Sequence, residues 1–131
     1  MATLVNDGLA YIPRIMGGLS TDYFKYVALG TDDTAEANAD AALGNEIITA
    51  DAVGGVRKVA GTVEYEADYK LNLVVSWTFT GTVGINEVGI FDVVTEEGGH
   101  MLMRHKFSAT KNVEGSDTLQ LTLKYTQSRA A

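Results

Sequence analysis

Along residues 118–126 apolar and polar side chains alternate at every position, and this pattern constrains the fold more than any other feature of the chain. A period of two is the spacing of a β-strand with one buried and one solvated face. A second alternating run extends from residue 59 to residue 80. Because that run is too long for one ordinary strand, we predict a turn or bulge between residues 68 and 72.

Three further segments have the composition of strands. Residues 23–30 are rich in aromatic and β-branched side chains. Residues 86–94 and 100–109 are joined by the sequence TEEGG, in which Gly98 and Gly99 supply the positive φ of a tight hairpin turn. The sum is a mainly β chain of about seven short strands. This predicts an antiparallel β-sandwich or a small barrel with one short helix.

The short helix is predicted at residues 34–43, which are rich in alanine. Asp33 and Glu36 have the spacing of a capping box, and Gly44 follows where a helix would end. The alternative for this segment is a compact loop that carries a short helical piece.

The first twenty residues fit the alternating pattern least well. A short helix is expected near residues 7–11, because Pro13 and the pair Gly17–Gly18 oppose a longer one. We therefore divide the chain into an N-terminal segment, residues 1–20, and a single β-sandwich domain, residues 21–131. The segment is interpreted as a contact arm that uses its apolar side chains, which are Leu4, Leu9, Tyr11, Ile12, Ile15 and Met16.

The composition excludes several classes of function. There are no cysteines, which excludes a disulfide framework, a thiolate metal site and a cysteine nucleophile. The net charge of −7 opposes binding to nucleic acid or to an anionic membrane surface. No apolar run approaches the ~18 residues of a spanning helix, and the N-terminus lacks the basic start of a signal peptide. We expect a protein made in the cytoplasm, with neither nucleic acid nor membrane as partner.

The stretch GINEVGIFDVVTEEGGHMLMRH, residues 84–105, gathers acids, histidines and an arginine, as an active site would. His100 and His105 are five residues apart, so on a strand they lie on opposite faces and cannot share a metal ion. We interpret the stretch as a hairpin in which Glu87 pairs with Arg104 across the two strands. The expectation is a protein without catalytic residues, metal or cofactor.

Other candidate sites are weaker. The acids at residues 32–40 have some of the spacing of a calcium loop but lack its central glycine and its closing acid. A glycan- or small-ligand-binding module would use an aromatic platform of Tyr23, Phe24 and Tyr26. An enzyme would use Asn86, Glu87 and His105.

Three motifs together resemble a family of small virion proteins of tailed phages and proviruses. The segment DGLAYIPRIMGGLSTDYFKYVALGTDDTAEANADAALGNEI is similar to the family's opening, GINEVGIFDVVTEEGGHMLMRHKF to its centre, and EGSDTLQLTLKY to its end. The resemblance covers nearly the whole chain. This sequence departs from the family at Asp32, where the family has glycine, and at Ser116, which separates the family's Gly-Asp pair.

The resemblance implies a non-enzymatic structural protein of the virion, made in the host cytoplasm. Its leading form is a capsid decoration (cement) protein that binds and stabilises the shell. The partners would be the major capsid protein and other copies of the chain, assembled as a trimer. The alternatives are a tail, baseplate or fibre component that binds a receptor, and the glycan-binding module.

Overall fold

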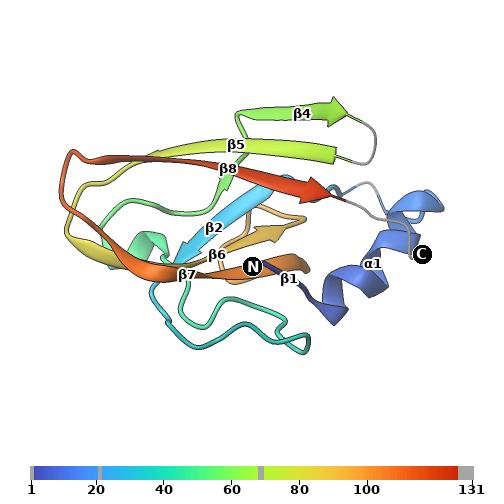
Figure 1. Cartoon of the computed structure of the whole chain (residues 1–131), viewed down its shortest axis with the longest axis horizontal. Helices are drawn as coiled ribbons and strands as arrows, with labels where there is room; N and C mark the ends of the chain where they lie inside the picture. The colour runs from blue at the N-terminus through green and yellow to red at the C-terminus, as the bar shows by residue number, and fades with distance from the viewer. Residues whose placement is uncertain (1, 21, 68–69, 127–131) are drawn as a thin grey trace.

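The computed structural model describes residues 2–20, 22–67 and 70–126, and these form two antiparallel sheets that pack face to face (Figure 1). The larger sheet has the strand order β1 (Thr3–Leu4), β7 (Met101–Val113), β6 (Val83–Phe91), β2 (Tyr26–Gly30) and β3 (Lys58–Val59). The smaller sheet has the order β4 (Thr62–Ala67), β5 (Lys70–Thr78) and β8 (Thr118–Thr126). One α-helix, α1 (Asn6–Met16), and a 3₁₀ turn, Thr49–Asp51, complete the elements.

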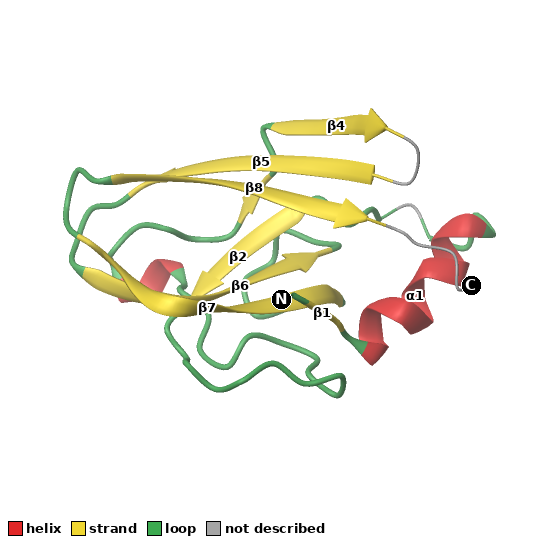
Figure 2. Ribbon diagram, in the orientation of Figure 1, coloured by secondary structure: helices red, strands yellow, loops and turns green. Residues whose placement is uncertain are grey.

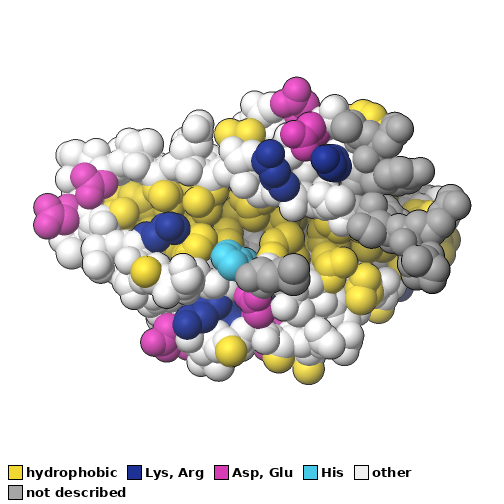
Figure 3. Space-filling model, in the orientation of Figure 1, with side chains coloured by type: hydrophobic (Ala, Val, Ile, Leu, Met, Phe, Trp, Pro, Cys, Tyr) yellow, Lys and Arg dark blue, Asp and Glu magenta, His cyan; other side chains and the backbone are white. Residues whose placement is uncertain are grey.

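The predicted mainly β class is confirmed, and of the two predicted architectures the sandwich is correct (Figure 2). The described strands form two separate sheets and do not close into a barrel. Along one side the sandwich is open, and a stripe of apolar side chains is visible between β8 and β7 (Figure 3). No helix among the described residues is long and apolar enough to cross a membrane.

The alternating runs form the strands that they predict. The run at 118–126 is β8, and the longer run divides into β4 and β5. The predicted break lies between Ala67 and Lys70, although the turn residues 68–69 themselves lie outside the described residues. The hairpin of β6 and β7 also forms. In its connecting loop Gly99 has a φ of +76°, but the other positive φ belongs to Glu97 at +59°, and the prediction for Gly98 was wrong.

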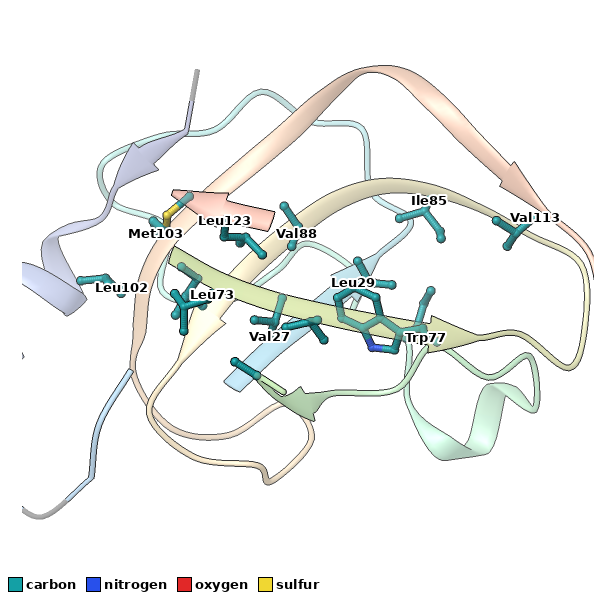
Figure 4. Packing of buried hydrophobic residues seen from close by; sticks show 14 of the residues in the cluster. Val27, Leu29, Leu73, Trp77, Ile85, Val88, Leu102, Met103, Val113 and Leu123 are labelled. Carbon is teal, nitrogen blue, oxygen red and sulfur yellow. The ribbon is translucent and has the colours of Figure 1, made fainter. Parts of the chain in front are cut away.

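The core lies between the two sheets and consists mainly of inward-facing residues of β2, β5, β6, β7 and β8 (Figure 4). Trp77 of β5 is 1% exposed, and its indole Nε1 donates a hydrogen bond to the carbonyl of Val56 at 2.9 Å. It packs in one cluster with Leu29 of β2 and Ile85 of β6. Burial of such side chains is the main stabilisation of the sandwich, at roughly 1.5–3 kcal/mol each.

The predicted helix at residues 34–43 was wrong, because this segment is an irregular loop. Acidic side chains in this segment and next to it accept hydrogen bonds from backbone N–H groups. Asp32 accepts from the backbone N–H of Thr34, and Glu36 accepts from the backbone N–H of Lys106 in β7. Side-chain to backbone bonds of this kind compete with a helical ladder.

The helix is instead in the N-terminal segment and is longer than predicted, since it runs through Pro13 to Met16. Tertiary packing holds it in place. At Gly8 the helix backbone approaches β7 so closely that a Cβ would lie 2.5 Å from the Cα of Leu102. Contact with β7 therefore outweighs the unfavourable proline.

The N-terminal segment is part of the sandwich. Strand β1 pairs with β7, with Thr3 opposite Arg104 and Leu4 opposite Met103. Val5 is 0% exposed and belongs to the core. Residues 1–20 are therefore not separate from the β-sandwich domain, because residues 3–5 complete its larger sheet and its packing. The contact role of the segment stays a prediction.

Candidate interaction surface

The carboxylate of Glu87 in β6 is fully buried and accepts four hydrogen bonds. Oε1 accepts from the backbone N–H of Gly44 at 2.8 Å and from Arg104 Nε at 2.9 Å. Oε2 accepts from the backbone N–H groups of Asp32 and Asn45, at 3.1 and 2.9 Å. A carboxylate has about four acceptor positions, so Glu87 is saturated.

Arg104 in β7 is the counter-ion of this carboxylate and is 2% exposed. Its other nitrogens reach the loop at residues 31–45, where Nη2 donates to the carbonyl of Thr34 at 2.9 Å and Nη1 to Asp40 at 3.3 Å. The structure thus brings Glu87 and Arg104 together. Together they hold the loop against the larger sheet, and we name these two side chains the loop clamp.

The loop approaches the clamp closely because of two glycines. A Cβ at Gly30 would overlap the carboxylate of Glu87, and one at Gly44 would overlap that of Asp32.

The hydrogen bonds that Thr34 donates from its hydroxyl and its backbone N–H lower the pKa of Asp32, and the Arg104 guanidinium acts in the same direction.

A second buried ion pair, Arg57 with Glu46, lies near the β6–β7 loop. Arg57 Nε donates to Glu46 Oε2 at 3.1 Å, and Nη1 donates to the carbonyls of Val93 and Gly98 at 3.1 and 2.8 Å. The guanidinium also lies 3.7 Å from the ring centroid of Phe91. This pair was not predicted from the sequence. The available signal was weak, since Glu46 and Arg57 each have an apolar residue on one side only, Ile47 and Val56.

The two histidines are in different surroundings. His100 Nδ1 lies 2.9 Å from Asp7 Oδ1, and its ring stacks on that of Tyr11 with centroids 4.2 Å apart. His105 Nδ1 lies 3.7 Å from Glu36. In residues 2–20, 22–67 and 70–126, no group of three His, Cys, Asp or Glu side chains is arranged to hold a metal ion.

Asn86, the third residue of the enzyme hypothesis, also binds the loop that follows β2. Its Nδ2 donates to the carbonyl of Thr31 at 2.8 Å, and its Oδ1 accepts from the Thr110 hydroxyl. Asn86 and Glu87 thus both hold the segment that follows β2. Asn86, Glu87 and Arg104 each bind backbone groups of the loop at residues 31–45, which is a structural use.

An apolar groove of about 690 Å³ lies between α1 and the smaller sheet, and we name it the helix–sheet groove. Its wall on the helix side includes Ile12, Ile15 and Met16, and its wall on the sheet side includes Val63, Leu71 and Tyr125. Tyr23, Phe24 and Lys25, which precede β2, also line it. Met16 is 80% exposed and Val63 is 51% exposed, so both rims offer apolar surface to solvent.

Three of the six predicted contact residues lie in this groove, and the other three lie elsewhere. Ile12, Ile15 and Met16 line the groove. Leu4 packs against the core, Leu9 is 48% exposed, and Tyr11 donates to or accepts from the Ser20 hydroxyl at 2.7 Å. Sequence reasoning missed the opposite wall, since nothing local links residues 12–16 to β5 or β8.

The predicted aromatic platform does not form from all three side chains. Tyr23 and Phe24 line the helix–sheet groove, whereas Tyr26 packs against a separate cluster that contains Val5 and Phe91. Tyr23 and Phe24 precede β2, which begins at Tyr26, so the regular alternation of a strand does not relate their directions to that of Tyr26. Only the first two remain candidates for contact with a ligand.

Comparison of the chain with models of protein families, with curated proteins and with solved structures found no match. The resemblance to virion proteins therefore stays a prediction.

Proposed function

We propose that this chain is a non-enzymatic structural protein of a tailed-phage particle, and that it decorates the capsid shell by binding the major capsid protein. The observation that carries the proposal is the helix–sheet groove, an apolar surface on a domain whose buried charged side chains are hydrogen-bonded within the protein. These side chains are Glu46, Arg57, Glu87, Asp92 and Arg104. The resemblance of three motifs to virion proteins supplies the type of particle.

Because the buried charged side chains are hydrogen-bonded within the protein, the groove is the better candidate for binding a partner. Glu87 has four hydrogen-bond donors, which fill its acceptor positions. Arg104 uses three of its five N–H groups on acceptors within the protein, and at 2% exposure it presents little surface to a substrate. Their work is to hold the loop at residues 31–45 on the sheet.

The groove suits an apolar segment of a partner protein. Its volume of about 690 Å³ accommodates several side chains, and its lining is apolar apart from Lys25 at the edge. Each aliphatic or aromatic side chain that becomes fully buried there contributes roughly 1.5–3 kcal/mol. Contacts of this size, repeated over a shell, would join neighbouring capsid subunits and stiffen them.

The test is cosedimentation of the protein with expanded, tail-free shells. The unsubstituted protein is expected to bind saturably and in high copy number. Met16→Asp, at the rim of the groove, should weaken binding by about tenfold or more, because it places a charge on the apolar contact. Leu19→Asp is the matched control, since Leu19 is 75% exposed but does not line the groove.

Deletion of residues 1–20 would not be a clean test, because it also removes β1 and the buried Val5. Equal binding by the two aspartate variants would overturn the groove as the docking site. Failure to bind shells, with the protein present only on tailed particles, would move the proposal to the runner-up function, a tail or baseplate component.

A further inference from the structure

Strand β8 is a long edge strand of the smaller sheet. In the part of the chain that the structure describes, its strand partner is β5, which it pairs at every position from Thr118 to Thr126 without a register shift. Natural edge strands are commonly short, bulged or charged, because a regular edge is a template for pairing with another chain. The nine residues of β8 include one charged side chain, Lys124.

The backbone groups that β8 directs to its free edge can be assigned. Phe79 donates its N–H to the carbonyl of Asp117 at 2.8 Å, in register with the β5–β8 ladder. Backbone polar groups alternate in direction along an antiparallel strand. The odd residues of β8 therefore bond to β5, and the even residues, from Thr118 to Thr126, direct their N–H and C=O groups outward.

The sequence of β8 is self-complementary about Thr122. Antiparallel pairing with a second β8 on a twofold axis there sets Thr122 opposite itself and Gln120 opposite Lys124. It also sets Thr118 opposite Thr126, Leu121 opposite Leu123 and Leu119 opposite Tyr125. Apolar residues thus face apolar residues, and no two like charges are opposed. Such cross-strand pairs are the favourable ones in antiparallel sheets.

The other edge of the same sheet, β4, has the opposite character. A twofold axis on Tyr65 would set Glu64 opposite Glu66 of the second copy, and an axis on Glu64 would set that carboxylate opposite itself. Like charges in direct opposition are destabilising. The two central registers of β4 are therefore opposed by like charges, whereas the central register of β8 is not.

The inward face of β8 has apolar surface for a second copy to cover. Leu119, Leu121 and Tyr125 are only partly buried and pack against the core cluster. A second groove, of about 210 Å³, runs between Leu121 of β8 and Phe107 of β7.

We infer that two copies of this chain associate through β8, antiparallel about a twofold axis at Thr122, and join their smaller sheets into one sheet of six strands. A contact of one surface with itself generates a twofold axis, so the unit in solution is a dimer and not the trimer expected from the sequence. This inference does not depend on the proposed virion function.

Charge gives the association a distinctive salt dependence. Each chain carries −7 overall, while β8 itself contributes one positive charge. Repulsion between the two chains is long-ranged and is screened by salt, with a screening length of about 10 Å at 0.1 M. Self-association should therefore strengthen as salt is added.

Cross-linking tests the twofold axis directly. Opposed residues of a hydrogen-bonded antiparallel pair have Cα atoms about 5.5 Å apart, within the range of a disulfide. The chain has no cysteine, so Thr122→Cys should oxidise to a covalent dimer through that residue alone. Thr78→Cys is the matched control, because Thr78 is also exposed on this sheet but lies on the central strand.

A charge exchange tests the same contact without a covalent bond. Thr122→Glu and Thr122→Lys should each weaken the dimer by about fivefold or more, and an equimolar mixture should restore it as a mixed dimer. Thr78→Glu should leave the dimer unchanged. Trp77 fluorescence reports whether each variant is folded.

A chain that stays monomeric up to millimolar concentration overturns the inference. A trimer, an oligomer that Thr122→Glu leaves intact, or equal cross-linking through Thr78→Cys overturns it as well. Shell binding is measured separately, so failure of β8 pairing and failure of shell decoration are distinguishable.

Discussion

Replacement of Glu87 by glutamine isolates the role of the loop clamp. Glutamine has almost the same shape but no charge, and one of its two terminal atoms donates hydrogen bonds where the carboxylate accepted them. If the amide oxygen takes the place of Oε1, the N–H groups of Asp32 and Asn45 lose their acceptor. If it takes the place of Oε2, Gly44 and Arg104 lose theirs.

The expected loss of stability follows from these bonds. Two buried donors without an acceptor cost about 1–3 kcal/mol each. Arg104, which is 2% exposed, also loses its nearest negative charge, although Asp40 at 3.3 Å and Asp32 at 3.7 Å still offset part of its own charge. We therefore expect Glu87→Gln to lower the free energy of unfolding by about 4 kcal/mol, a large part of the 5–15 kcal/mol typical of a domain.

Urea unfolding followed by fluorescence measures this loss, because the single tryptophan, Trp77, is in the core at 1% exposure. With a slope of about 2 kcal/mol per molar urea, the midpoint should fall by about 2 M. Hydrogen exchange at the amides of Gly44 and Asn45 should accelerate as well, since both donate to Glu87. Glu114→Gln, the same change at an exposed position, should move the midpoint by no more than about 0.3 M.

Two results would refute the reasoning. A midpoint shift no larger than that of Glu114→Gln would mean that the carboxylate contributes little to stability. A large shift with unchanged exchange at Gly44 and Asn45 would mean that Glu87 stabilises the sheet without holding the loop.

Two further substitutions test neighbouring contacts. Asp32→Asn should destabilise the chain near neutral pH but progressively less below about pH 4, because the folded-state pKa of Asp32 is lowered and its contribution is lost as pH falls through that value. Urea midpoints measured from pH 6 to pH 3 check this, and a constant difference would contradict it. Arg57→Lys should cost about 2–3 kcal/mol, since lysine can neither bind Glu46 through two parallel bonds nor stack on Phe91, and an unchanged urea midpoint would contradict that role.

The secondary structure was predicted best where the signal is local. The alternation in 118–126 defines β8, and the position of the β6–β7 hairpin also defines which strands carry Glu87 and Arg104. The contact between these two residues could be expected because they lie on adjacent strands close to one turn. Their other partners, in the loop at residues 31–45, are 42 or more residues away from Glu87 in the sequence.

The failed helix prediction at 34–43 shows the limit of local reasoning. The capping pattern of Asp33 and Glu36 is compatible with a helix, but Glu36 instead binds the backbone of Lys106, 70 residues away. In the same way, α1 persists through Pro13 because β7 supports it. Distant contacts decided both segments against their own preferences.

The sequence by itself therefore determined the class of the protein, since strand period, turn glycines and the absence of cysteine are properties of short stretches or of composition. Only the tertiary structure decided which polar groups are satisfied, which apolar faces remain open and which sheet edges are unprotected. The helix–sheet groove joins residues 12–16 to Leu71 and Tyr125, and β8 is an edge because the sheet ends there. Each of these features depends on which distant segments come into contact, and the side-chain pattern within one segment does not specify its distant partners.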